Sequence, residues 1–206
     1  MAQPTTQTGI VNNALTRIGS NDRLVSFDTG GGNTGERARA LWDDLRRLLL
    51  AMHPWNFAIA RAPLNAASAA PEFGYTRKFQ LPADCLRWLP PGDRREDHYF
   101  DGELEGRFIL TDAVAPLRIR YIRDHTTVSE WSPGFVMAMT QALAEWLSEP
   151  VTQSVGMTDR MVEMAERAVK VGKRLDGLET GRRRMGGVVA RSDWLAARHR
   201  AYPGNR

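Results

Sequence analysis

Apolar residues recur at helical spacing in four segments of the chain, two before and two after a region of short apolar runs. The first predicted helix covers residues 8–18, with Gly19 placed to cap its end. The second follows a Gly- and Asn-rich loop, begins at a cap of Asn33 or Thr34, and ends before Pro54, because the residue before a proline is pushed out of the helical region. The predicted buried stripe of this second helix comprises Ala38, Leu41, Trp42, Leu45, Leu48, Leu49 and Met52, with Arg46 among the residues off the stripe.

Two further helices are predicted in the second half of the chain. The third has Ser132 as its cap and Pro133 in its first turn, and ends before Pro150. Its predicted buried residues are Phe135, Met139, Leu143, Trp146 and Leu147. The fourth has a predicted buried stripe of Met161, Met164, Ala165, Ala168, Val171, Leu175 and Leu178.

Between these pairs of helices, Pro and Gly divide the chain into short runs that favour strands. We predict strands over residues 55–59, 75–81, 85–89, 107–110 and 117–123. In the last run, apolar residues alternate with Arg118 and Arg120, which is typical of a half-buried strand. Asp101-Gly102 is the predicted tight turn.

The order of the elements predicts an α+β fold. Each helix has one apolar stripe and too little core of its own, so we expect a helical bundle formed by the N- and C-terminal helices, with an antiparallel β domain inserted between them. The predicted domains are 1–60 and 130–180 for the bundle and 61–129 for the β domain, followed by an extended basic C-terminal tail over 181–206.

Length and composition are those of an ordinary globular protein: 206 residues, of which 42% are hydrophobic and 25% charged. The single cysteine, Cys85, excludes an intrachain disulfide and a paired-cysteine metal site, and favours assembly in a reducing compartment. The first residues are polar and no apolar stretch follows them, so no export signal is predicted. The longest apolar run, residues 48–52, is too short for a membrane span.

The net charge of +4 suggests a nucleic-acid binder until the charges are located. Residues 181–206 carry seven arginines against one aspartate, a net charge of +6. The other 180 residues hold 21 of the 28 Lys and Arg and 23 of the 24 Asp and Glu, a net charge of −2. The basicity therefore belongs to the tail.

No stretch of the sequence predicts a cofactor or metal site. Residues 30–35 have the G-x-G-x-x-G spacing of dinucleotide sites, but no strand precedes them and no crossover follows the helix, so we interpret them as a flexible loop. The four histidines lack the spacing that places two imidazoles on one helix face, and His53 is interpreted as a structural residue at a helix end.

The carboxylates and the thiol do not favour an enzyme either. Asp43 and Asp44 are adjacent on a helix, so their side chains diverge, and we expect them on a solvated face. The alternating group Asp101, Glu103 and Glu105 leaves a glycosidase pair open, although its turn-rich surroundings favour exposure. Cys85 is predicted to be a buried small hydrophobe.

Arginines and one tryptophan mark the tail as a candidate docking segment. Trp42 and Trp146 lie on helical stripes and are predicted to be core, whereas Trp194 has no local core to bury it. Aromatic residues and arginines are favoured anchors of protein interfaces. The candidate portal-docking residues are Arg182, Arg183, Arg184, Arg191, Trp194, Arg198 and Arg200.

Several strings occur together in an order that resembles the tail tubular protein A family, the head-to-tail adaptors of short-tailed bacteriophages. They are IVNNALTRIG over 10–19, ERARALW over 36–42, LLAMHPWNFA over 49–58, FQLPADCLR over 79–87, IRYI over 119–122, WSPGF over 131–135 and EPVT over 149–152. The resemblance spans residues 8–152 and rests on the order of these strings; the tail from Gly181 has no recognisable counterpart.

The resemblance implies a structural, non-enzymatic protein that forms a ring, dodecameric in relatives, at the head-tail junction of the virion and is assembled in the host bacterial cytoplasm. Its implied partners are the portal protein above, the tail nozzle protein below, other copies of itself, and double-stranded DNA that passes through without sequence specificity. Neither a cofactor nor a membrane is implied. In related connectors a C-terminal extension reaches onto the portal, which is the role expected for the arginine-rich tail.

Two other functions remain open. One is a DNA-binding head-completion protein that uses the arginine-rich tail. The other is a peptidoglycan-degrading head-completion protein, because some phage proteins of related shape attack the cell wall. Likeness of fold does not by itself transfer an activity.

Overall fold

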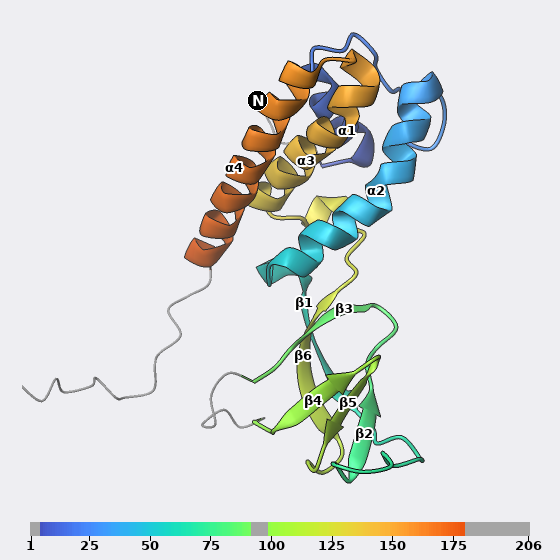
Figure 1. Cartoon of the computed structure of the whole chain (residues 1–206), viewed down its shortest axis with the longest axis vertical. Coiled ribbons are helices and arrows are strands. Elements are labelled where there is room, and N and C mark those ends of the chain that lie inside the picture. The colour runs from blue at the N-terminus through green and yellow to red at the C-terminus, as the bar shows by residue number, and fades with distance from the viewer. Residues whose placement is uncertain (1–4, 92–98, 180–206) are drawn as a thin grey trace, which may run out of the picture.

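The computed structural model describes residues 5–91 and 99–179 and has an α+β fold, as predicted. Four helices form one half of the molecule and six strands form the other (Figure 1). The helices are α1 (Gln7–Arg17), α2 (Gly32–Met52), α3 (Pro133–Thr152) and α4 (Val155–Glu179). The strands are β1 (Ile59–Leu64), β2 (Arg77–Gln80), β3 (Cys85–Leu89), β4 (Gly102–Glu105), β5 (Phe108–Thr111) and β6 (Leu117–Arg123), and the short 3-10 helices are η1 (Asn56–Ala58) and η2 (Val128–Glu130).

α3 is the central helix of the bundle and contacts α1, α2 and α4. It is buried on most of its circumference, as expected for a helix surrounded by others. Ser132 caps it by accepting a hydrogen bond from the Phe135 N–H, which confirms the predicted start. In the part of the chain that the structure describes, no helix is long and apolar enough to cross a membrane.

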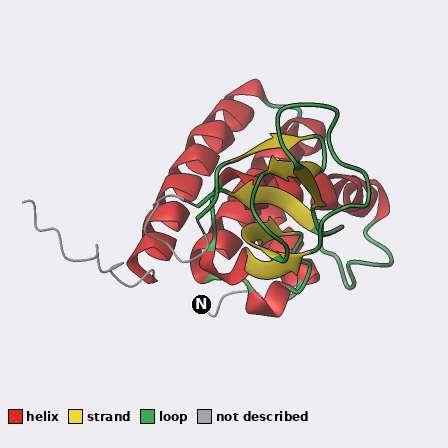
Figure 2. Ribbon diagram, turned by 90° about the horizontal axis from the view of Figure 1, so that it is seen from below, coloured by secondary structure: helices red, strands yellow, loops and turns green. Residues whose placement is uncertain are grey.

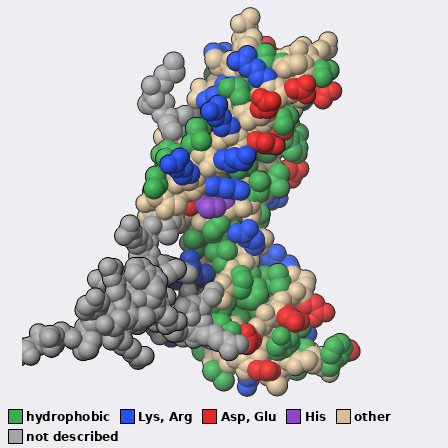
Figure 3. All heavy atoms as spheres, turned by 60° about the vertical axis from the view of Figure 1, so that its left-hand side comes forward, with side chains coloured by type: hydrophobic (Ala, Val, Ile, Leu, Met, Phe, Trp, Pro, Cys, Tyr) green, Lys and Arg blue, Asp and Glu red, His purple; other side chains and the backbone are tan. Residues whose placement is uncertain are grey.

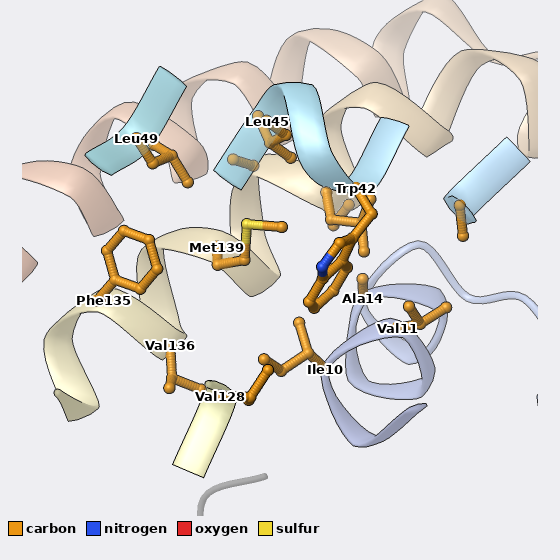
Figure 4. Packing of buried hydrophobic residues seen from close by; sticks show 14 of the residues in the cluster. Ile10, Val11, Ala14, Trp42, Leu45, Leu49, Val128, Phe135, Val136 and Met139 are labelled. Carbon is orange, nitrogen blue, oxygen red and sulfur yellow. The ribbon is translucent and has the colours of Figure 1, made fainter. Parts of the chain in front are cut away.

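The core of the bundle is a continuous set of aromatic and aliphatic side chains from all four helices (Figure 4). Trp42 of α2 stacks on Trp131 with ring centroids 5.9 Å apart, and Trp131 meets Phe135 edge to face at 4.9 Å. Trp42 is 3% exposed, which confirms its predicted place in the core.

The β half contains two antiparallel three-stranded sheets, with strand orders β1-β6-β3 and β2-β5-β4. Figure 2, which views the molecule from below, shows the strands in front of the helices. β6 joins the halves: Leu117, Ile119 and Tyr121 face the β core, whereas Ile122 belongs to the bundle core. The alternation predicted for this strand is confirmed, since Arg118 is exposed.

The start of α2 differs from the prediction. Helix α2 begins at Gly32, with Gly31 as its cap, and not after Asn33 or Thr34. Gly31 has φ of 80°, a left-handed conformation that glycine adopts without strain. The Thr34 hydroxyl donates to Asp22 instead of capping the helix.

The end of α3 also differs from the prediction. α3 continues through Pro150 to Thr152. Proline removes only one backbone N–H donor from the last turn. The turn still closes, because the Gln153 N–H donates to the Glu149 carbonyl at 2.9 Å.

Two predictions in the β half are wrong. The predicted strand over 55–59 is replaced by η1, because the Trp55 indole donates to the Leu49 carbonyl at 2.9 Å and turns the chain back against α2. The predicted turn at Asp101-Gly102 is also displaced: Gly102 pairs with Thr111 inside β4, and Gly106, with φ of 57°, makes the hairpin turn.

An ionic cluster around the buried Arg46 connects α2 to the end of β6. Arg46, predicted to lie off the buried stripe, is 2% exposed and donates to Asp43 and Asp124, and Arg47 donates to Asp124 at 2.9 Å. Burial alone would raise the pKa of Asp124, but these hydrogen bonds outweigh it and hold the pKa below its usual value. Arg46 therefore links the helical half to the β half through its ion pair with Asp124.

Candidate assembly surfaces

The residues predicted to dock on the portal, Arg182, Arg183, Arg184, Arg191, Trp194, Arg198 and Arg200, lie outside the described residues. Their role stays a prediction. The structure does describe α4, the helix that leads to them, and two surfaces of the bundle that the sequence patterns did not identify.

The predicted stripe of α4 is only partly buried. The residues that face the bundle are Met161, Ala165, Ala168, Gly172 and Asp176. Four members of the predicted stripe are exposed: Met164 at 38%, Val171 at 41%, Leu175 at 42% and Leu178 at 75%. The prediction that these four residues are core is therefore wrong.

A close backbone approach explains this rotation of α4. A Cβ on Gly172 would lie 2.7 Å from the carbonyl oxygen of Gly134 in α3. Ala165 and Ala168 are small, buried residues on the same side of α4. α4 therefore packs against the bundle through its small residues and not through its larger apolar ones. Apolar side chains next to this contact line are left outside the bundle.

Three arginines run beside the exposed apolar residues. Arg160, Arg167 and Arg174 recur every seven residues, which places them on one side of the helix, about 10.5 Å apart along its axis. We call this surface the basic stripe: Arg160, Arg167 and Arg174 with Met164, Val171, Leu175 and Leu178. Figure 3, which brings the left side of Figure 1 forward, shows Lys and Arg side chains interspersed with hydrophobic ones over the helical half.

A second surface combines carboxylates with an exposed aromatic ring. Trp146 of α3, predicted to be core, is 43% exposed. Glu149 follows it by one turn and is exposed, and Glu145 precedes it. Burial raises the pKa of Glu145, and the nearby charge of Glu166 on α4 raises it further.

α2 extends this surface on the other side of α3. The Arg37 guanidinium donates to the Pro150 carbonyl at 2.7 Å, so this side of α2 faces the exposed end of α3. Asp44 and Leu48 lie two and three turns further along the same side of α2, and Leu48, predicted to be buried, is 49% exposed. We call the combined surface the acidic face: Asp44, Leu48, Glu145, Trp146, Glu149 and Glu166.

The C-terminal part of α4 is fixed by one buried carboxylate. Asp176 is 2% exposed and accepts hydrogen bonds from the Asn56 N–H at 2.9 Å and from His53 Nε2 at 3.0 Å. The Asn56 amide donates to the Asp176 carbonyl as well, at 2.8 Å. His53 thus has a structural role at the end of α2, as predicted, and sets the direction in which α4 ends.

The described residues include most of those considered above as candidate ligands or nucleophiles. Over 5–91 and 99–179, no group of three His, Cys, Asp or Glu is placed to hold a metal ion. Cys85 is buried, as predicted, and burial raises the pKa of its thiol, which disfavours the thiolate form that a nucleophile needs. Glu103 and Glu105 are exposed on β4.

Neither a scan against protein-family models nor a search of curated proteins finds a match to this chain. The resemblance to the tail tubular protein A family therefore stays a prediction.

Proposed function

We propose that this protein is a structural head-to-tail adaptor of a phage or phage-like particle. Copies of the chain form a ring, a dodecamer by resemblance, between the portal protein and the tail nozzle protein, and double-stranded DNA passes through the ring without sequence-specific contacts. The protein has no catalytic role. It acts in the virion at the head-tail junction, after assembly in the host bacterial cytoplasm.

The basic stripe is the observation that carries the proposal. Exposed apolar residues in a row, flanked by charged ones, are typical of a surface that another protein covers. Leu178, at the end of this row, is 75% exposed although it lies on an apolar stripe of helical period. An assembly subunit accounts for this exposure, whereas a monomeric enzyme gives no reason for it.

The arrangement of the two halves is consistent with an adaptor. The bundle and the β half lie at opposite ends of the molecule (Figure 1), and the ion pairs of Arg46 with Asp124 connect them. One end can therefore meet the portal while the other meets the tail, as the resemblance implies. The chain outside the tail has a net charge of −2, which does not hold DNA electrostatically.

Binding to tailless heads tests this function. The purified protein is mixed with DNA-filled heads that expose their portal, and bound copies are counted by native mass spectrometry of the extracted portal complex. We expect multiple copies per portal and retention of DNA in the heads. Absence of binding to portals contradicts the adaptor function. If portal binding is absent and DNA affinity depends on the tail, the DNA-binding alternative is favoured. Clearing in a peptidoglycan zymogram favours the peptidoglycan-degrading alternative.

A further inference from the structure

We propose that the basic stripe of one copy docks on the acidic face of a second copy of this chain. The contact is then heterologous, since each copy uses two different surfaces. The inference rests on the proposed function and specifies which surfaces of neighbouring subunits meet.

The two surfaces lie on different sides of the bundle. Glu166 and Val171 are five residues apart on α4, which separates their directions by about 140° around the helix. α2, which contributes Asp44 and Leu48, lies across α3 from α4 (Figure 1). A subunit can therefore use both surfaces at once, with one neighbour on each side.

Contacts of either surface with itself bring like charges together, although exposed Glu163 lies one turn from Arg160 and Arg167, and exposed Lys170 lies one turn from Glu166. If two basic stripes paired about a two-fold axis, Arg160, Arg167 and Arg174 of one copy would approach the same arginines of the other. Two acidic faces would likewise oppose Asp44, Glu149 and Glu166 to one another. Like charges at an interface oppose association, so the second surface of the chain is the better partner for each.

The chemistry of the two surfaces is complementary. The basic stripe supplies exposed aliphatic side chains and three guanidinium groups, and the acidic face supplies an exposed indole and carboxylates. Arginine binds carboxylates in a bidentate geometry and stacks on tryptophan. A cation brought by the neighbour would favour the ionised form of Glu145, whose pKa is raised by burial and by Glu166.

Residues on α2 support this assignment of charges. The cations on or next to this side of α2 have partners within the chain: Arg37 donates to the Pro150 carbonyl, and Arg47 pairs with Asp124. Asp44 is exposed beside Leu48. The acidic face therefore presents carboxylates to an approaching subunit although α2 also carries arginines.

Charge reversal within one chain tests the pairing. The stripe variant carries Arg167→Glu and Arg174→Glu, and the face variant carries Asp44→Arg and Glu149→Arg. Each should raise the concentration needed for self-association by about 100-fold. The four-substitution chain, which reverses both surfaces, should assemble again, because opposite charges are restored across a heterologous contact. Sedimentation velocity at low salt and native mass spectrometry measure the assembled fraction up to about 1 mM protein.

The control variant reverses Arg61 and Arg118 to glutamate, with the same change of net charge as the stripe variant, at exposed positions of β1 and β6. It should assemble as the unaltered chain does. Circular dichroism checks that every variant is folded.

The pairing is overturned if the stripe or face variant assembles normally, if the four-substitution chain fails to assemble, or if the unaltered chain stays monomeric up to the highest concentration. Dimers that stop at two copies also contradict it, because a heterologous contact adds further subunits. None of these outcomes bears on binding to tailless heads, so the adaptor function can survive them. Conversely, rescue by the four-substitution chain supports the pairing even if heads are not bound.

Discussion

Gly134 of α3 and Gly172 of α4 bring the two helices together through their backbones. A Cβ on Gly172 would lie 2.7 Å from the Gly134 carbonyl oxygen and 3.1 Å from the Trp55 ring. No L side chain fits at these distances unless one helix moves. This contact decides which side of α4 is buried, and therefore which apolar residues remain exposed.

Replacement of Gly172 by alanine should destabilise the bundle. Although alanine favours a helix by about 1 kcal/mol over glycine, the clash with backbone atoms is expected to outweigh this, with a net loss of about 1–3 kcal/mol in the free energy of unfolding. Urea denaturation measures the loss. Gly177→Ala on the same helix is the matched control, since nothing lies within 4 Å of its added Cβ, and it should be neutral or stabilising. Equal effects of the two substitutions would contradict this account.

Removal of the Asp176 carboxylate should loosen the end of α4. Asp176→Ala leaves the Asn56 N–H and the His53 ring without their acceptor in a buried position, which should cost about 2–3 kcal/mol in the free energy of unfolding. Hydrogen exchange should accelerate most in the last two turns of α4. Glu179→Ala, at an exposed position of the same helix end, provides the control. Uniform acceleration along the whole chain would assign a global role to Asp176 instead.

The junction between the halves should weaken in acid. The pKa of Asp124 is lower in the folded than in the unfolded chain, because Arg46 and Arg47 hydrogen-bond to the carboxylate. Its contribution to stability is thus present above the unfolded pKa and is lost as the pH falls through the folded pKa. Asp124→Asn should lower the melting temperature at pH 7 and have a smaller effect at pH 2–3. A loss of the same size at both pH values would exclude the ionised carboxylate as the cause.

Local patterns predicted the elements whose environment is set by their neighbours in sequence. The strands over 85–89 and 117–123 were predicted to the residue, since alternation along one strand determines which side faces the core. The Ser132 cap is equally local, because acceptor and donor lie three residues apart. The fold class followed from the order of such elements.

Two of the failures involve partners that lie far away in sequence. Arg46 is buried because Asp124, 78 residues later, accepts its hydrogen bond. Val171 is exposed because the close contact between Gly134 and Gly172 brings the side of α4 that carries Gly172, about 100° around the helix from Val171, against α3. A period of 3.6 residues predicts an apolar side but not how much of it a neighbour covers. Arg160, Arg167 and Arg174 are spaced seven residues apart in the sequence. This spacing is the signal by which the basic stripe could have been found.

Glu145 should be a source of instability in the isolated subunit. Burial, and then the charge of Glu166, raises its pKa, so the ionised form disfavours folding above the unfolded pKa. Glu145→Gln should therefore raise the melting temperature at pH 7, and this gain should vanish as the pH falls below the unfolded pKa. The measurement is made at concentrations too low for assembly. The exposed neighbour substitution Glu149→Gln is the control, and an equal gain from it would contradict a specific effect of burial.

Affinity for DNA should reside in the tail. Without residues 181–206 the chain has a net charge of −2, so few counterions are released on contact with a duplex, and we expect a Kd weaker than about 10⁻⁵ M at physiological salt. The whole chain should bind more tightly, with a steeper dependence of log K on log salt, because seven arginines are added. Fluorescence anisotropy with a labelled duplex at several salt concentrations measures both quantities. A full-length chain with the seven tail arginines changed to glutamine separates charge from length and should behave like the truncated protein. Tight, salt-dependent binding by the truncated chain would mean that the bundle or the β half holds DNA, and would contradict a ring through which DNA passes freely.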